Sequence, residues 1–289
     1  MRDFAVMIIR LTCDSLVADL APLLGGAIAA FWDGETTLMS PSGPGGVCEF
    51  PMGPWVNRLA EGSLRWGGER AWIPRNTSEH AFPIHGVGWR APWDVVAQGQ
   101  RHAVLRLTRD ADAHWPWAGL AMTRRFTLSP GLLEVRFEAT HDDARPMPVA
   151  LGLHPYFPVR DALVKMHVEG YWRTINDIPV TRTEIPLLGA LRHGAVMSAH
   201  KVDNGLDGWD GRAEIIWPEH TLTIETDPPQ RFAQLYMPKG WEYFCLEPQS
   251  AMPGGSSHPD GPYKILERGE IFGFTTRFVF SRTAPAAAR

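Results

Sequence analysis

Two short stretches of the sequence place an ionisable side chain between apolar residues and a proline. In "LGLHPYFPVR", residues 151–160, His154 precedes a proline and two aromatic residues. In "YFCLEPQSAMPGG", Glu247 follows three apolar residues and also precedes a proline. Burial disfavours a charged imidazole and raises the pKa of a carboxyl, which makes that carboxyl a better base near neutral pH. The pattern is typical of a general acid and a general base, and also of a core histidine and an ion-paired strand end.

Two further stretches hold side chains that bind hydroxyl groups well. Asn57 and Arg58 lie in "GPWVNRLAEGSLRWGG", a turn bounded by glycines, and His80 and His85 are five residues apart in "HAFPIHGVGWRAPW". Five tryptophans crowd the same region: Trp55, Trp66, Trp72, Trp89 and Trp93. Most of them are expected in the core, but a sugar also needs flat apolar walls with a few hydrogen-bonding groups between them. The combination of His, Glu, Arg, Asn and Trp predicts a carbohydrate site.

Motifs of other catalytic classes are weak or missing. "GVGWRA" fits the glycine pattern of a dinucleotide-binding turn, but a proline follows it and no strand–helix–strand context surrounds it. The sequence has no P-loop, HExxH or GxSxG motif, and its eleven histidines are too dispersed for a spaced set of metal ligands. We therefore expect no nucleotide, no metal and no other cofactor.

The composition predicts a soluble protein. With 289 residues, of which 44% are hydrophobic and 21% charged, the chain can bury a sizeable core. A net charge of −4 argues against a nucleic-acid partner. Cys13, Cys48 and Cys245 are widely spaced and odd in number, which favours a reducing compartment. "MRDFAVMIIRLTCD" is expected to be a first strand rather than a signal peptide, and charged, proline and glycine residues interrupt the apolar stretch 17–31. We expect a cytoplasmic protein without a membrane span.

Apolar and polar residues alternate along many segments, which is the period of a half-buried strand. The alternation is clearest in "HAVLRLTRD" (102–110), "LLEVRFEAT" (132–140), "TLTIET" (221–226) and "GFTTRFVF" (273–280). Glycine and proline are frequent, and no long segment shows a helical period. The sequence predicts an all-β protein, an antiparallel sandwich or barrel with few short helices. We expect one domain over residues 1–282 and a frayed tail over 283–289.

Five motifs, taken in order, make the chain similar to a known family. "NRLAEG", "IHGVGWRAPW", "HPYF", "VDNGLDGWDGRAEI" and "FCLEPQS" resemble the aldose 1-epimerases, also called galactose mutarotases. The resemblance extends from about residue 20 to about residue 280. It implies a large antiparallel β-sandwich and a cofactor-independent isomerase that interconverts the α and β anomers of a free hexose or pentose.

The resemblance also implies which residues carry the chemistry. The histidine of "HPYF" corresponds to His154, which would be the general acid that protonates the ring oxygen of the sugar. The glutamate of "EP" corresponds to Glu247, which would be the general base that removes the proton of the C1 hydroxyl. Opening a hemiacetal ring requires this pair of proton transfers, and each group typically contributes 10²–10⁴-fold to the rate. An acid and a base with pKa values near neutrality suit the exchange, and we expect a half-buried His154, beside Tyr156 and Phe157, to be such an acid. Neither a metal nor a covalent intermediate is required.

The same resemblance implies a set of sugar-binding residues. Arg58, with Asn57 beside it, and His85 would hold sugar oxygens. The sugar-binding aspartate corresponds most closely to Asp203. The aromatic residue that usually follows it three positions later is a leucine here, and Asp207 is therefore a rival.

Three other functions fit the same residues. An epimerase of a phosphorylated or otherwise charged sugar would need several cations around the pocket. Four arginines lie in the same half of the chain as Arg58 and His85: Arg65, Arg70, Arg75 and Arg90. A non-catalytic sugar-binding protein would have the pocket without the reaction. A glycosidase would use Glu247 and Asp203 as a carboxylate pair about 5–10 Å apart. In each case the expected partner is a small sugar, and the expected protein is a monomer or a homodimer.

Overall fold

Strands make up most of the chain, as the alternation predicts. The computed structural model describes residues 7–66, 68–112, 115–175, 178–228, 230–255 and 263–283. The first strand, β1 (Ile9–Cys13), confirms the strand expected near the N-terminus. The expected tail lies, apart from Thr283, outside the described residues. Within the described ranges, none of the helices is long and apolar enough to cross a membrane.

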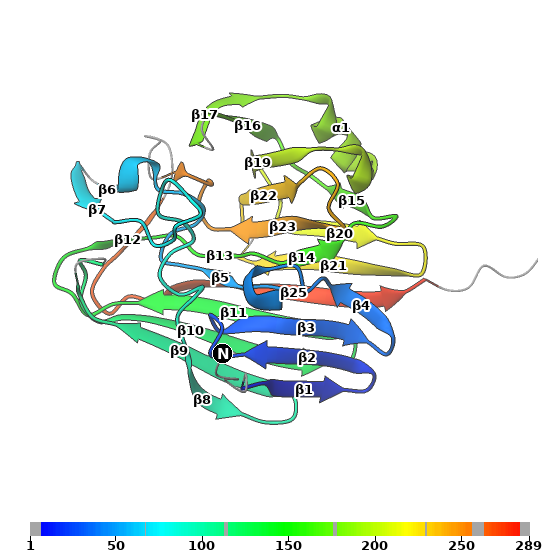
Figure 1. The fold of residues 1–289 in the computed structure, drawn as a ribbon, viewed down its shortest axis with the longest axis horizontal. Helices are drawn as coiled ribbons and strands as arrows, with labels where there is room; N and C mark the ends of the chain where they lie inside the picture. The colour runs from blue at the N-terminus through cyan, green and yellow to red at the C-terminus, as the bar shows by residue number, and fades with distance from the viewer. Residues whose placement is uncertain are drawn as a thin grey trace, which may run out of the picture.

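Two large antiparallel sheets dominate the described part of the chain (Figure 1). The nine-stranded sheet has the order β18–β15–β20–β21–β25–β11–β10–β9–β8. Its strands are β8 (Asp94–Gln98), β9 (His102–Arg109), β10 (Leu120–Ser129), β11 (Leu132–Thr140), β15 (Leu163–Met166), β18 (Ala195–Val196), β20 (Arg212–Ile216), β21 (His220–Asp227) and β25 (Phe272–Arg282).

The eight-stranded sheet carries most of the residues discussed below. Its order is β17–β16–β19–β22–β23–β13–β5, and β14 also pairs with β23. Its strands are β5 (Pro51–Met52), β13 (Gly152–Leu153), β14 (Tyr156–Pro158), β16 (Gly170–Ile175), β17 (Ile178–Thr183), β19 (Val202–Asp207), β22 (Phe232–Met237) and β23 (Tyr243–Gln249).

Three smaller sheets and one α-helix complete the described architecture. β1 to β4 form a four-stranded sheet, and β12 with β24 and β6 with β7 form two-stranded ones. The bounds are β2 (Leu16–Ala21), β3 (Ala27–Asp33), β4 (Thr36–Met39), β6 (Ser63–Trp66), β7 (Glu69–Trp72), β12 (Met147–Val149) and β24 (Lys264–Leu266). The helix is α1 (Pro186–His193), and short 3-10 turns cover Pro44–Gly46, Ala60–Gly62 and Met197–Ala199. The prediction of few short helices is confirmed.

The four segments with the clearest alternation are all strands, namely β9, β11, β21 and β25. In β11, Leu133, Val135 and Phe137 are buried and alternate with residues that are partly or fully exposed. A shift of one residue would turn these side chains to solvent, so their burial fixes the register of β11 with β10 and β25. Burial of each such side chain contributes about 1.5–3 kcal/mol.

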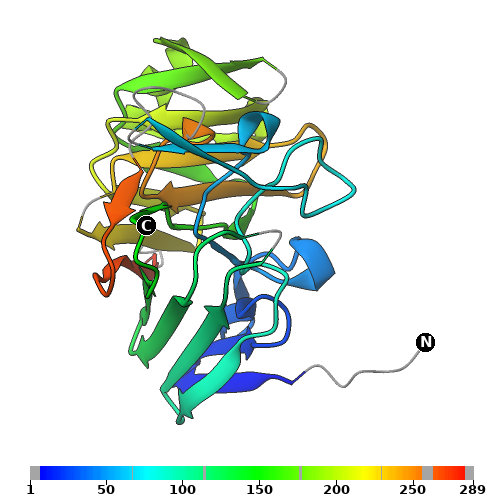
Figure 2. The same cartoon turned by 90° about the vertical axis from the view of Figure 1, so that its left-hand side faces the viewer.

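One core joins the sheets. A single cluster of buried apolar side chains includes Leu20 of β2, Phe137 of β11 and Leu235 of β22. β1 also packs against β9 and β10. Figure 2 shows the blue N-terminal strands beside the green strands at the lower end of the molecule. The predicted antiparallel all-β architecture is confirmed.

One face of the eight-stranded sheet brings distant parts of the chain together. The residues paired at one level across β19, β22, β23 and β14 are Asp203, Tyr236, Cys245 and Tyr156. Two residues further along β22 and β23, Gln234 lies opposite Glu247. Because alternate strand residues point to the same face, all these side chains share one side of the sheet.

Candidate active site

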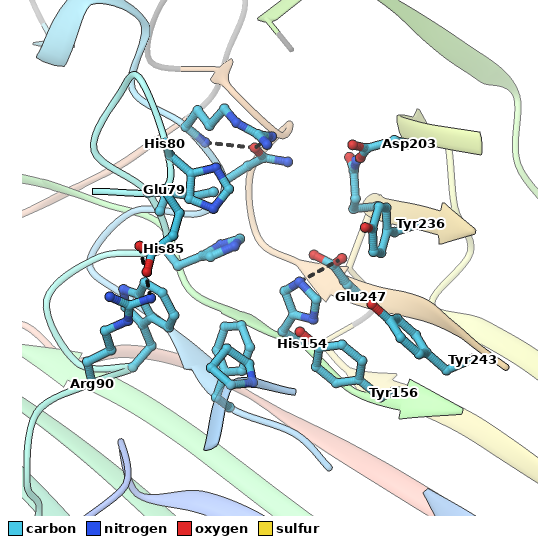
Figure 3. Close-up of a pocket in the computed structure, with 17 residues that line it drawn as sticks. Glu79, His80, His85, Arg90, His154, Tyr156, Asp203, Tyr236, Tyr243 and Glu247 are labelled. Atoms are coloured by element: carbon cyan, nitrogen blue, oxygen red, sulfur yellow. Dashed lines mark hydrogen bonds and ion pairs between the residues drawn. The ribbon is translucent and has the colours of Figure 1, made fainter. Parts of the chain in front are cut away.

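A cavity of about 330 Å³ lies over this face of the eight-stranded sheet. Its lining includes all six residues that the sequence predicts for the site: Asn57, Arg58, His85, His154, Asp203 and Glu247. Figure 3 shows His80 and His85 on one side of the space, and Asp203, Tyr236 and Glu247 on the other. The fold therefore brings together residues that are up to 190 positions apart in the chain, from Asn57 to Glu247.

His154 and Glu247 form a buried pair. His154 Nε2 lies 3.2 Å from Glu247 Oε1, and the two side chains are only 9% and 2% exposed. Gln249 Nε2 donates a hydrogen bond of 3.1 Å to the other oxygen, Glu247 Oε2. The backbone N–H of His154 donates to the carbonyl of Phe50 at 3.0 Å. These contacts hold an imidazole and a carboxyl within the distance that proton transfer requires.

Burial shifts the pKa of each group in the direction that favours its neutral form. It raises the pKa of Glu247 well above the ordinary 4.5, and the charge of Asp203 adds to the rise. It lowers the pKa of His154 from 6.5 to about 3. The sequence predicts a value near neutrality for His154, and the structure differs because the ring is almost fully enclosed. Burial therefore favours a neutral imidazole beside a carboxylic acid, a form in which the pair holds one exchangeable proton.

Aromatic rings orient the imidazole of His154. The ring stacks on Phe50 and on Tyr156, with centroids 4.5 Å and 4.9 Å away. Phe157, which the sequence places beside the histidine, instead packs against Phe244 at 5.6 Å in the core. Successive strand residues alternate between faces, so Tyr156 points to the cavity and Phe157 points away from it.

Asn57 and Arg58 lie in a tight turn. Asn57 has a φ of +50°, a left-handed conformation that asparagine adopts more readily than most residues. Its Oδ1 accepts hydrogen bonds from the backbone N–H of Arg58 at 2.8 Å and from Arg58 Nη1 at 3.2 Å. Asn57 therefore orients the guanidinium that lines the cavity, and its own contact with a sugar stays a prediction.

A sharp backbone turn presents His85 to the cavity. His85 has a φ of +60° and Gly86 a φ of +81°, and a Cβ on Gly86 would lie 1.8 Å from the carbonyl oxygen of Gly53. Asn76 clamps the turn: its Nδ2 donates to the carbonyls of Ile84 at 2.7 Å and Gly86 at 2.9 Å. Its Oδ1 accepts from the backbone N–H of Ile84 at 3.0 Å. The sequence analysis does not identify Asn76, because its role depends on contacts eight and ten residues away.

The two candidate aspartates of β19 have different surroundings. Asp203 lines the cavity, and its Oδ1 accepts a hydrogen bond of 2.6 Å from Gln234 Nε2. Asp207 accepts two hydrogen bonds of 2.8 Å from Arg182 and one of 2.6 Å from Trp172 Nε1. Since Asp207 is held away from the cavity lining, position favours Asp203 as the residue that meets a ligand.

Part of the cavity wall comes from residues without a predicted role. Tyr236 and Tyr243 line the cavity with their ring centroids 6.4 Å apart, and Gln234 and Glu79 line it as well. Alternation places Tyr236 and Gln234 on one face of the same strand, but only the pairing of distant strands brings that face to the site. Strand pairing is not a local property of the sequence, so these residues could not be identified from it.

The tryptophans and arginines of the first half of the chain mostly lie elsewhere. Of the five crowded tryptophans, Trp89 lines the cavity, whereas Trp55 and Trp93 are in the core. Of the four arginines considered for a charged sugar, Arg90 lines it. The Arg90 guanidinium lies 4.1 Å from the centroid of the Trp89 ring, and its Nη2 is 3.4 Å from Glu79 Oε2.

Within the described ranges, one group of side chains has the composition and spacing of metal ligands. It consists of His154, Cys245 and Glu247, whose donor atoms all lie within 4.8 Å of one another. Cys245, like Cys13 and Cys48, is a free and buried thiol. The sequence does not predict this group, because the histidine is far from the other two residues along the chain.

The chain matches the family model described as aldose 1-epimerase over residues 7–279. It belongs to the aldose 1-epimerase family, as the five motifs predict. The uncharacterized protein YphB of Escherichia coli (strain K12) is 28% identical to it over 254 residues, which cover 82% of this chain and 86% of YphB.

Solved structures agree with this assignment. A protein of Escherichia coli K12 assigned provisionally as an aldose 1-epimerase has a TM-score of 0.89 at 25% identity, over 96% of this chain and 99% of the other. A galactose mutarotase-like protein from Clostridium acetobutylicum has a TM-score of 0.82 at 16% identity, over 96% and 95% of the two chains. The second likeness concerns the fold alone.

Proposed function

We propose that this chain is a cofactor-independent aldose 1-epimerase that interconverts the α and β anomers of a free, uncharged hexose or pentose. The observation that carries the proposal is the buried contact of 3.2 Å between His154 Nε2 and Glu247 Oε1. This pair lines a cavity together with Arg58, His85 and Asp203, which have donors and acceptors for sugar hydroxyls.

In this proposal the pair moves two protons in each half of the reaction. The Glu247 carboxylate takes the proton of the C1 hydroxyl, the C1 carbonyl forms, and the bond between C1 and the ring oxygen breaks. The ring oxygen takes a proton from the protonated His154 imidazole. After rotation about the C1–C2 bond the same transfers run in reverse, and the ring closes on the other face of the carbonyl.

The proton balance of this cycle fits the buried pair. The cycle begins with a protonated imidazole and a carboxylate, and it passes through a neutral imidazole and a carboxylic acid. Each of these forms holds one exchangeable proton, so the reaction takes none from solvent. Burial favours the neutral form, in which the open-chain aldehyde is bound, while the positive charge of Arg58 favours the Glu247 carboxylate that starts the cycle.

Charge around the cavity favours a neutral sugar over a phosphorylated one. A phosphate clamp needs several cations, and Arg90 is already paired with the carboxylate of Glu79. Asp203 lines the same space, and its carboxylate would repel a phosphate. Arg58 then serves to donate to sugar hydroxyls rather than to neutralise a ligand charge.

Proton NMR with saturation transfer tests this function. Irradiation of the α-anomeric proton of equilibrated D-glucose or D-galactose should reduce the β-anomeric signal when the protein is added, because the two anomers then exchange faster. Binding without exchange would support the non-catalytic sugar-binding protein instead. Release of reducing sugar from an aryl glycoside would support the glycosidase that pairs Glu247 with Asp203.

A further inference from the structure

Three buried side chains, two of which line the cavity, have donor atoms that suit a borderline divalent cation. Cys245 and Glu247 are two residues apart in β23, so their side chains point to the same face of the sheet. His154 comes from the segment between β13 and β14, and β14 pairs with β23. The imidazole nitrogen, the thiol and the carboxylate oxygen all lie within 4.8 Å of one another. A nitrogen, a sulfur and an oxygen ligand form a set that Zn²⁺ accepts.

The spacing is close to that of a tetrahedral site. Zinc bonds of about 2.0–2.3 Å place neighbouring ligand atoms roughly 3.3–3.6 Å apart. The separation of 3.2 Å between His154 Nε2 and Glu247 Oε1 is about 0.1 Å below this range. The donor atoms lie within 4.8 Å of one another, so the Cys245 sulfur needs to approach by at most about 1.2–1.5 Å. Three protein ligands leave the fourth position of a tetrahedral ion for water.

We infer that His154, Cys245 and Glu247 form a binding site for Zn²⁺, and that the bound ion blocks the site. A metal held by the imidazole nitrogen and the carboxylate occupies the lone pairs that proton transfer uses. Binding of the cation is independent of the proposed function, whereas the inhibition rests on it. The cysteine is then the residue that makes an acid–base pair sensitive to zinc.

The three side chains are nearly inaccessible to other partners. Cys245 is fully buried and Glu247 is 2% exposed, so the ion would reach them through the cavity that His154 and Glu247 line. Zn²⁺ binding requires the thiolate and the carboxylate, so it releases the protons that these two groups hold.

Titration with Co²⁺ and Zn²⁺ tests the site. Protein freed of metal should bind one Co²⁺ and develop the near-ultraviolet absorption of a cobalt–thiolate bond, and Zn²⁺ should displace it. Cys245→Ala should abolish this absorption and weaken Zn²⁺ binding at least about 10-fold, as expected when a metal site loses a supporting group. Cys13→Ala is the matched control, because Cys13 is also buried and free but lies in β1, outside the ligand group.

The activity arm uses the same proteins in mutarotation assays with and without chelator. With chelator, Cys245→Ala should turn over at the rate of the wild type. With added Zn²⁺, the wild type and Cys13→Ala should be inhibited and Cys245→Ala should not. Equal Zn²⁺ affinity of Cys245→Ala and wild type, or cobalt binding without thiolate absorption, would overturn the site. If none of the proteins catalyses mutarotation, the proposed function fails, and the cobalt spectrum of the wild type still decides the metal site.

Discussion

Replacing His154 by asparagine removes one of the two titrating groups of the buried pair. The substitution therefore reveals how much the titration of His154 contributes to the pH dependence of stability. In the unfolded chain the imidazole has its ordinary pKa of 6.5, and in the folded protein burial lowers it to about 3. Because the folded protein binds this proton less tightly than the unfolded chain does, the stability of the fold is highest above pH 6.5 and decreases as the pH falls below it. As the pH falls from 7 to 5, the unfolded chain gains a proton at His154 that the folded protein does not. The free energy of unfolding therefore falls by about 2 kcal/mol through this group.

The assay is unfolding in guanidinium chloride at pH 7 and pH 5 for wild type and His154→Asn. The wild type should lose about 2 kcal/mol relative to the variant between the two pH values. The lost hydrogen bond costs about 1–3 kcal/mol at either pH, so it cancels in this comparison. A difference that stays constant within about 0.5 kcal/mol, the usual limit of additivity, would refute a buried neutral imidazole and the single shared proton.

Three other substitutions test separate parts of the site. Glu247→Gln should lower kcat at least about 100-fold with an unchanged melting curve, because an amide cannot accept the proton; a residual rate above about a tenth would exclude a general base. Arg58→Lys should raise KM more than it lowers kcat in steady-state assays, since an ammonium lacks the two parallel donors of a guanidinium. A fall in kcat at constant KM would place Arg58 in the chemical step. Gly86→Ala should lower stability by more than about 1 kcal/mol and raise KM by displacing His85, because its Cβ would meet the Gly53 carbonyl at 1.8 Å. Gly240→Ala, with the same φ of +81° and nothing within 4 Å, is the control, and an equal effect of the two variants would contradict the steric argument.

The class of fold could be predicted because its signal is local. The alternation in 132–140 places Leu133, Val135 and Phe137 on one face, and a one-residue shift would expose all three. The order of strands could not be predicted in the same way. β25 pairs with β11 and with β21, and no short segment of the sequence specifies partners so far apart in the chain.

The site could be predicted where a motif carried it. His154 and Glu247 stand in motifs whose proline and aromatic neighbours mark them, and the structure places them 3.2 Å apart. Asn76 acts through hydrogen bonds to the backbone around His85, and no pattern of residue types marks such a role. The expectation that the pKa of His154 lies near neutrality was wrong, because burial lowers it, and part of what encloses the ring, such as Phe50, is about a hundred residues away in the sequence.

Polarimetry of freshly dissolved α-D-glucose and α-D-galactose at pH 7 tests the central claim most directly. The wild-type protein should bring the optical rotation of at least one of these sugars to its equilibrium value faster than buffer, in proportion to protein concentration. With Glu247→Gln at the same concentration, the acceleration over the buffer rate should be at least about 100-fold smaller than with the wild type. A wild-type rate equal to that of buffer for both sugars at every protein concentration, or an equal acceleration by Glu247→Gln, would contradict catalysis by the His154–Glu247 pair.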